Sequence, residues 1–326
     1  MKRIKGTILS LAAAAALLGA APATAQDEAF PSRIIKIVVA NPPGGVGDVI
    51  TRVLGDRMRA DLGQPVVIEN RPGASTMIGT QAVARARPDG YTLLNLTASG
   101  VVQTAIRKSL PYSLERDLVP VIGIGSFPMV LSVPATSDLK SFADLTTAIR
   151  SKDGVTYASG GLGTLAHLTA AQLIHELKGT GTHVPFQGNS FAIQALMSGQ
   201  VQMFFPTTLE TQAPVSGGTI RPLAVTSGQR YAGLPDVPTL NELGFAGFNP
   251  RVWFAFMAPA GTPEPIVRRL HDAFAKACED PAVKERLAAL GFTMELRTPD
   301  MLSRLIAEET ARWGNVVKEN NIEVND

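Results

Sequence analysis

Residues 34–48 read I-I-K-I-V-V-A-N-P-P-G-G-V-G-D, and this stretch decides the fold. An apolar, β-branched run stops at the glycine-rich turn Asn41–Gly45, and a helical pattern begins at Asp48. A strand, a glycine-rich turn and a helix in this order present bare backbone N–H groups that can bind an anion. A second turn of similar kind, Ser159–Thr164, follows much later in the chain. Two such turns facing each other would hold a small anionic ligand between them.

The rest of the chain alternates strand and helix patterns. Short apolar runs predict strands at Ile34–Ala40, Val66–Glu69, Thr92–Leu96, Val155–Ala158, His183–Phe186, Val201–Phe205, Ile220–Thr226 and Arg251–Ala258. Helical periodicity predicts helices at Asp48–Leu62, Ile78–Arg85, Thr164–Leu177, Pro263–Cys278, Pro281–Leu290 and Pro299–Asn320. This alternation predicts an α/β fold of mostly parallel sheets flanked by helices.

Two interrupted apolar stretches, Val119–Leu131 and Phe248–Phe254, are candidates for strands that cross between two domains. The chain length fits two domains of ordinary size, and no low-complexity linker marks a boundary. We therefore predict a first domain of residues 26–125 plus 251–326 and a second domain of residues 126–250. A chain that leaves one domain, builds another and returns makes a cleft with a hinge.

The N-terminus has the pattern of a secretory signal. Basic residues within 2–5 precede an apolar run over 8–21, and Ala23–Ala25 fits an A-x-A cleavage site. We expect cleavage after Ala25 and export. An uncleaved anchor is disfavoured, because the run is shorter than the roughly 20 residues that a membrane span needs. Residues 26–326 hold 27 basic and 28 acidic side chains and no polybasic patch, so nucleic acid is not an expected partner.

Polar residues near the predicted strand ends are candidates for ligand contact, because ligands of parallel α/β sheets lie at the carboxyl ends of strands. Thr97 and Ser99 follow one strand and could add hydroxyls to the cleft. Asp48 is expected to cap the first helix, and His167 is either a capping or core residue or a ligand contact. Each glycine-rich turn could also be an ordinary connection between a strand and a helix.

Signatures of catalysis and of metal binding are missing from the sequence. It contains no G-x-S-x-G, G-x-x-x-x-G-K-[ST] or H-E-x-x-H motif, and its four histidines lack metal-ligand spacing. Cys278, the single cysteine, is expected to be a buried apolar residue. Ser159 and His167 are the nearby candidates for a nucleophile and its base, with no evident orienting acid. We predict no enzyme activity, no metal and no cofactor, and we keep a secreted hydrolase as an alternative.

Several phrases of the sequence together resemble the Bug family of extracytoplasmic solute receptors, which serve tripartite tricarboxylate transporters. They are P-P-G-G-x-x-D at Pro42–Asp48, G-Q-P-V-V-I-E-N-R-P-G-A at Gly63–Ala74, P-D-G-Y-T-L-L at Pro88–Leu94, Y-A-S-G-G-x-G-T-x-x-H-L at Tyr157–Leu168, L-A-V-T-S at Leu223–Ser227, L-P-D-V-P-T at Leu234–Thr239 and A-P-A-G-T-P at Ala258–Pro263. The resemblance covers essentially all of residues 26–326.

The resemblance implies a two-domain periplasmic binding protein of the type II fold, with a cleft between its domains. It implies that the two glycine-rich turns hold a ligand carboxylate, largely through backbone groups and ordered waters. It also implies delivery to a membrane permease with a large and a small subunit. The residues expected to contact the ligand are Pro43, Gly44, Gly45, Val46, Gly47, Asp48, Thr97, Ser99, Ser159, Gly160, Gly163, Thr164, His167, Thr207 and Arg251.

Departures from the family pattern bear on the ligand. Family members often have an acid just after the strand that is here predicted at Val201–Phe205, where this chain has Pro206-Thr207-Thr208. Such an acid could pair with a ligand amine, so its loss disfavours an amino acid. Arg251 offers a fork for a second carboxylate, or else forms a structural salt bridge. Trp253 and Phe191 could supply apolar walls or belong to the core.

We therefore expect a monomeric periplasmic receptor for a small carboxylate, with dicarboxylates and aromatic carboxylates favoured over amino acids. The receptor would bind its ligand by shifting an open–closed equilibrium and pass it to a tripartite tricarboxylate-type permease. A ligand-dependent sensory partner of a membrane kinase is a further alternative.

Overall fold

The computed structural model describes residues 30–320 and 322. The predicted signal peptide and its cleavage site lie outside these residues. From Arg33 on, the described chain forms one compact unit. In this part of the chain no helix is both long and apolar enough to cross a lipid bilayer.

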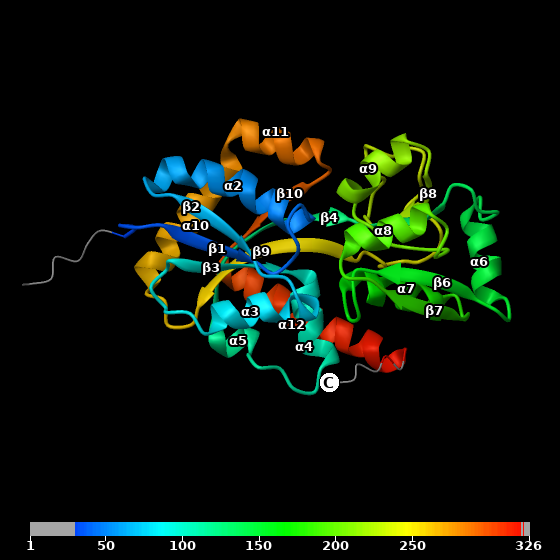
Figure 1. Cartoon of the computed structure of the whole chain (residues 1–326), viewed down its shortest axis with the longest axis horizontal. Helices are drawn as coiled ribbons and strands as arrows, with labels where there is room; N and C mark the ends of the chain where they lie inside the picture. The colour runs from blue at the N-terminus through cyan, green and yellow to red at the C-terminus, as the bar shows by residue number, and fades with distance from the viewer. Residues whose placement is uncertain (1–29, 321, 323–326) are drawn as a thin grey trace, which may run out of the picture. The chain divides into compact units, whose positions relative to one another are not determined.

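A six-stranded sheet forms the first part of this unit, with strand order β10-β4-β9-β3-β1-β2 (Figure 1). Strands β1, β2 and β3 pair in parallel, whereas β9 runs antiparallel to both β3 and β4, and β10 runs antiparallel to β4. Four strands therefore point one way and two the other, which confirms the predicted α/β class and makes the sheet mixed. The strands are β1 (Ile35–Val39), β2 (Val66–Asn70), β3 (Thr92–Thr97), β4 (Leu118–Pro128), β9 (Arg251–Pro259) and β10 (Thr293–Arg297).

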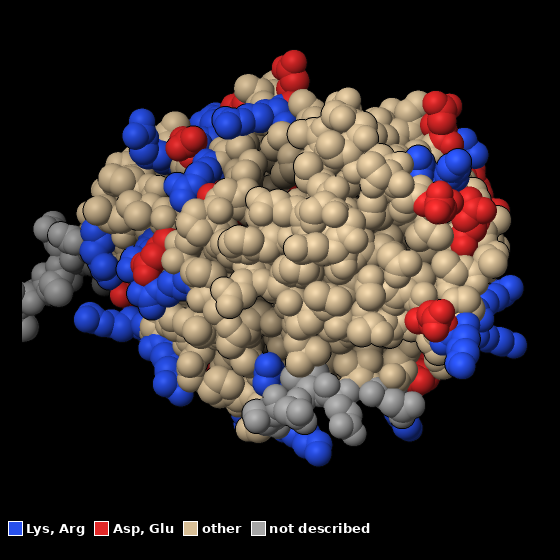
Figure 2. All heavy atoms as spheres, turned by 45° about the vertical axis from the view of Figure 1, so that its right-hand side comes forward, with Lys and Arg blue, Asp and Glu red and all other residues tan. Residues whose placement is uncertain are grey.

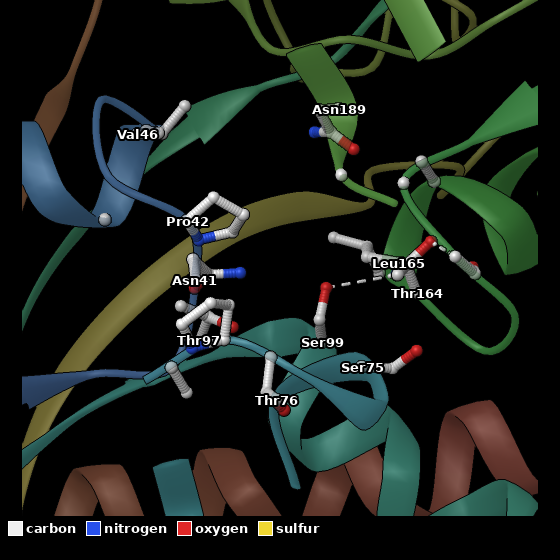
Figure 3. A pocket seen from close by; sticks show the side chains of 18 of the residues that line it. Asn41, Pro42, Val46, Ser75, Thr76, Thr97, Ser99, Thr164, Leu165 and Asn189 are labelled. Atoms are coloured by element: carbon white, nitrogen blue, oxygen red, sulfur yellow. Dashed lines mark hydrogen bonds between the residues drawn. The ribbon is translucent and has the colours of Figure 1, made fainter. Parts of the chain in front are cut away.

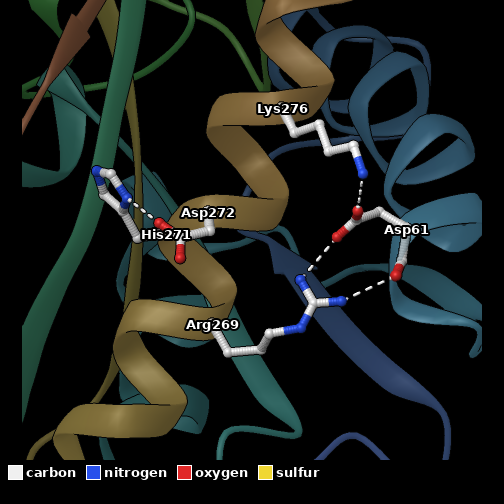
Figure 4. Close-up of polar contacts among 5 residues, drawn as sticks. All are labelled: Asp61, Arg269, His271, Asp272 and Lys276. Atoms are coloured by element: carbon white, nitrogen blue, oxygen red, sulfur yellow. Dashed lines mark hydrogen bonds and ion pairs between the residues drawn. The ribbon is translucent and has the colours of Figure 1, made fainter.

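Helices cover both faces of this sheet (Figure 1). Helix α2 packs against α10 and α11, while α12 packs against α4 and β4. Asp61, near the end of α2, forms ion pairs with Arg269 and Lys276 of α10 (Figure 4). The elements around the sheet are α2 (Val46–Leu62), the short 3₁₀ helix η1 (Ala74–Thr76), α3 (Met77–Ala84), α4 (Ala98–Ile106), α5 (Leu114–Asp117), α10 (Glu264–Glu279), α11 (Pro281–Ala289) and α12 (Pro299–Glu319).

The second part of the unit contains two strand pairs and four helices. Strands β5 and β8 pair antiparallel, and β6 and β7 pair parallel. The predicted strand Val201–Phe205 lies between these pairs and makes isolated bridges through Met203 and Phe204. The elements are β5 (Val130–Pro134), α6 (Phe142–Arg150), β6 (Val155–Ser159), α7 (Leu165–Glu176), β7 (Gly181–Pro185), α8 (Asn189–Met197), α9 (Thr208–Ser216) and β8 (Ile220–Val225).

Strands β4 and β9 connect the two parts. They pair antiparallel from Leu118↔Pro259 to Pro128↔Arg251, and β5 begins directly after β4. Below, lobe 1 means the six-stranded sheet with its helices, and lobe 2 means β5 to β8 with α6 to α9. The two predicted crossing stretches fall on this strand pair. The division into independent domains at residues 125 and 250 stays a prediction.

Candidate functional site

A cavity of about 640 Å³ lies where the carboxyl ends of β1 and β3 meet the turn after β6. Figure 3 shows Pro42 and Val46 on its lobe 1 side and Thr164 and Asn189 on its lobe 2 side. The position follows from the fold, because the loops at the carboxyl ends of parallel strands meet at one edge of a sheet. Eight of the predicted contact residues line it, namely Gly45, Val46, Gly47, Thr97, Ser99, Gly160, Thr164 and Thr207.

Four helices begin at this cavity without a hydrogen bond to the side chain of their own N-cap residue. Their N-cap residues are Gly45 for α2, Thr97 for α4, Thr164 for α7 and Gly188 for α8, and all four line the cavity. The first N–H groups of a helix lack intrahelical partners, and the helix dipole places partial positive charge at the same end. Four such ends create an environment that favours an anion without any cationic side chain.

Formal charge at the cavity is confined to one carboxyl group. Among the described residues, no Lys or Arg lines the cavity, and Glu210 is the acid that does. Glu210 Oε2 accepts hydrogen bonds from Thr207 N at 2.7 Å, Thr207 Oγ1 at 2.9 Å and Asn189 Nδ2 at 3.3 Å, and it completes the capping box of α9. Burial raises the pKa of Glu210, although these hydrogen bonds oppose that rise. An anionic ligand is therefore expected to bind most tightly when Glu210 is protonated.

The lobe 2 turn is held against lobe 1 by hydrogen bonds beside the cavity. Ser99 Oγ accepts from Leu165 N at 3.2 Å (Figure 3), and Ser75 Oγ donates to Leu162 O at 2.9 Å. Gln103 Nε2, fully buried, donates to Gly163 O at 2.7 Å. These bonds fix the N-terminus of α7, whose first residues Leu165 and Ala166 line the cavity.

A strained segment also lines the cavity and was not predicted. Ala74, Ser75 and Thr76 have φ of 45°, 51° and 85° in succession. Residues other than glycine rarely adopt such angles, and strain of this kind clusters at ligand sites. Sequence reasoning also missed Asn41, Asn189, Glu210 and Phe254 as lining residues.

Several predicted contact residues do not line the cavity. They are Pro43, Gly44, Asp48, Ser159, Gly163, His167 and Arg251. Asp48 accepts from Gly44 N at 2.9 Å and pairs with Arg52 at 2.8 Å. Burial alone would raise the pKa of Asp48, but the bonds from Arg52 and Gly44 hold it below its usual value. Asp48 thus serves the turn itself.

The predicted pair of Ser159 and His167 does not form. Ser159 is 0% exposed, and its Oγ lies 2.7 Å from Nε2 of His183 instead. His167 Nδ1 accepts from Gly163 N at 3.1 Å, and its ring stacks on that of His183 at 3.7 Å between centroids. Burial lowers the pKa of His167 to about 3 and that of His183 to about 4, so both are neutral at physiological pH. The cluster braces the second glycine-rich turn and presents no nucleophile to the cavity.

Arg251 and Trp253 face away from the cavity. Val252 and Phe254 line it, and alternate residues of a strand point to opposite faces. Arg251 and Trp253 instead line a separate small hollow. Of the two alternatives for Trp253, the structure has the buried one, and Phe254 lines the cavity instead.

Metal binding, thiol chemistry and nucleic-acid binding were also considered for the described part of the chain. No group of three or more His, Cys, Asp or Glu side chains could hold a metal ion there. Cys278 is buried as predicted, and burial raises the pKa of its thiol to about 12. On the face seen in Figure 2, Lys and Arg atoms lie toward the margins with acidic atoms among them. That distribution differs from the continuous basic surface typical of nucleic-acid binding.

Comparisons with known proteins give the chain its relatives. The family model described as "Tripartite tricarboxylate transporter family receptor" matches residues 50–322. Protein BugT of Bordetella pertussis is 38% identical over 304 residues, which are 92% of each chain.

Solved structures agree with these matches. The periplasmic binding protein BugD is 30% identical with a TM-score of 0.84, over 90% of this chain and 99% of its own. MatC of Rhodopseudomonas palustris, solved with bound malate, is 32% identical with a TM-score of 0.82, over 88% and 100%. The R. palustris protein Rpa4515, solved with adipate, is 30% identical with a TM-score of 0.84, over 90% and 99%. The predicted periplasmic-binding-protein fold is confirmed.

Proposed function

The chain belongs to the tripartite tricarboxylate transporter receptor family, and from this premise we propose that it captures a small organic carboxylate in the periplasm. The convergence of four uncapped helix N-termini on one cavity carries the proposal. Backbone N–H groups and hydroxyls there can surround a carboxylate that no Lys or Arg of the described chain reaches.

A dicarboxylate is our first choice among carboxylates. Two relatives were solved with malate and with adipate, which both carry two carboxyl groups. An aromatic carboxylate is the second choice, because Phe186, Phe191 and Phe254 line the cavity. Phe191 is 56% exposed, so it stands at the edge of the site rather than in the core.

Amino acids are included among the ligands to be tested, because the cavity does contain an acidic side chain, that of Glu210. The argument against them rested on the missing acid directly after Phe205. Glu210 lines the cavity a few residues further on and could accept a hydrogen bond from a ligand amine or hydroxyl. A hydroxy-dicarboxylate could use both the helix N-termini and Glu210.

The biological role we propose is delivery. The mature receptor, cleaved after Ala25, would act as a monomer and present its closed, loaded form to a permease with a large and a small subunit. Ligand would favour the closed state because both lobes line the cavity, so the two sets of contacts form together only on closure.

A thermal-shift screen with the mature protein tests the proposal. The panel pairs each acid with its amide: malate, adipate, terephthalate and aspartate, each with the matching amide. A ligand present at a hundred times its Kd adds about 2.7 kcal/mol to the free energy of unfolding, which is easily seen in Tm. We expect at least one acid to raise Tm and its amide to have no effect. If no acid does so, or if acid and amide act alike, the proposed function is wrong.

A further inference from the structure

A second hollow, of about 120 Å³, lies on the other side of the strands that connect the lobes. It uses the face of β9 opposite to the carboxylate cavity, since Arg251 and Trp253 alternate with Val252 and Phe254. Strand β4, strand β10 and helix α12 supply the rest of its wall. The polar residues around it are Ser126, Asn249, Arg251, Arg297, Glu309 and Arg312.

Positive charge is in excess at this hollow. Arg312 Nη1 lies 3.7 Å from Glu309 Oε1 and 3.4 Å from Asn249 Oδ1. Arg297 Nη2 lies 2.7 Å from Glu295 Oε1, and its side chain is largely buried. Arg251 has no acidic partner among the described residues. Three guanidinium groups, those of Arg251, Arg297 and Arg312, are therefore balanced by two carboxylates, and the guanidinium of Arg251 is the one without an acidic partner in the described chain.

A buried donor without a partner lines the same hollow. Trp253 is 5% exposed, and its Nε1 makes no hydrogen bond within the described chain. The neighbouring Trp313 shows the contrast, because its Nε1 donates to Glu309 Oε2 at 2.8 Å. A buried N–H without an acceptor is unfavourable and rare in folded proteins. An acceptor oxygen placed in the hollow would satisfy Trp253 and pair with Arg251 together.

We propose that this hollow binds a small oxyanion, such as inorganic phosphate or sulfate, separately from the carboxylate cavity. The guanidinium fork of Arg251 matches two oxygens of such an ion, and an indole N–H can donate to a third. The limited volume excludes nucleotides and other large phosphates. The site touches β4, β9 and α12 together, so a bound ion ties the connecting strands to the C-terminal helix.

Tryptophan fluorescence reports on this site, because Trp253 lines the hollow and Trp313 donates a hydrogen bond to Glu309, which also lines it. Inorganic phosphate is titrated into the purified protein at constant ionic strength, balanced with chloride. We expect a saturable change, and we expect Arg251→Gln to raise the apparent Kd for phosphate about tenfold or more. Arg230→Gln is the matched control, since Arg230 is exposed and pairs with Glu242, and neither residue lines the hollow. Trp253→Phe removes the indole N–H, while the phenyl ring still fills most of the space of the indole. Calorimetry should therefore show weaker phosphate binding by this variant.

Two further measurements distinguish free phosphate from an organic phosphate and check that Arg251→Gln is correctly folded. Glycerol 3-phosphate should bind more weakly than inorganic phosphate if the natural ion is free and small, and more tightly if it is an organic phosphate. Arg251→Gln should keep the wild-type Tm without ligand and the Tm rise with the best carboxylate, which separates this site from the proposed function. Absence of saturable binding in the wild-type protein, or equal loss in Arg251→Gln and Arg230→Gln, would overturn the proposal.

Discussion

Replacing Glu210 with glutamine should remove the pH dependence of dicarboxylate binding. Glu210 accepts three hydrogen bonds from Thr207 and Asn189, and a glutamine oxygen can accept the same bonds and keep the capping box. Burial raises the pKa of Glu210, and a bound carboxylate would raise it further, so binding takes up a proton wherever Glu210 is ionised. Affinity of the wild-type protein should therefore fall as the pH rises through that pKa.

The size of the effect follows from the dimensions of the cavity. A volume of about 640 Å³ is that of a sphere about 11 Å across, so we take about 5–8 Å as the separation between Glu210 and a ligand carboxylate bound at the helix N-termini. With an effective dielectric constant of about 20, two unit charges at that separation repel by about 2–3 kcal/mol. At alkaline pH, Glu210→Gln should therefore bind a dicarboxylate on the order of 30- to 150-fold more tightly than the wild-type protein.

Calorimetry from about pH 5.5 to about pH 9 measures this difference. Glu242→Gln is a matched control, because Glu242 accepts from Thr239 N at 2.8 Å in a similar capping arrangement outside the cavity. The control should follow the wild-type curve. Equal affinities of Glu210→Gln and wild type at about pH 9, or the same pH slope in both, would refute the reasoning.

Three further substitutions test the framework of the site. Gly163→Ala should lower the free energy of unfolding by about 2–5 kcal/mol in urea denaturation, because φ is +70° and the new Cβ would lie 1.9 Å from Ile106 Cδ1. In an Ile106→Ala background the same glycine substitution should cost less, because the clashing methyl group is gone. An equal cost in both backgrounds would contradict the clash. Asp61→Asn should cost about 0.5–2 kcal/mol at neutral pH. Ion pairs lower the pKa of Asp61, so its contribution must vanish as the pH falls through that lowered pKa, and a constant difference between pH 7 and pH 3 would contradict this. Ser99→Ala should weaken the best carboxylate a few-fold in calorimetry, since the hydroxyl holds Leu165 N at the cavity, and unchanged affinity would count against that role.

Local sequence patterns predicted most elements of lobe 1 well. The β-branched run before Asn41 is β1, and the amphipathic pattern after Gly45 is α2, because burial on one side enforces both periods. Fewer helices of lobe 2 were predicted from the sequence. Helices α8 and α9 went unrecognised, and α9 even carries Pro214 inside it. The spacing of Thr207 and Glu210 is nevertheless that of a capping box, and it could have revealed both α9 and the acid in the cavity.

The candidate site was predicted in outline and not in every contact. The two glycine-rich turns do meet at one cavity, as their place after strands requires. The placement of Arg251 and Trp253 opposite to Val252 and Phe254 is predictable from the sequence, because alternate residues of a strand point to opposite faces. The strained backbone at 74–76 has no comparable signal, because tertiary contacts hold residues there that do not favour positive φ.

Isothermal titration calorimetry of the mature protein with its best acid and the matching amide tests the central claim most directly. The cavity offers neutral donors from four helix N-termini, so binding should depend on the negative charge of the ligand. We predict saturable binding of the acid at one site per chain and no measurable binding of the amide. Amide affinity equal to that of the acid would contradict the account.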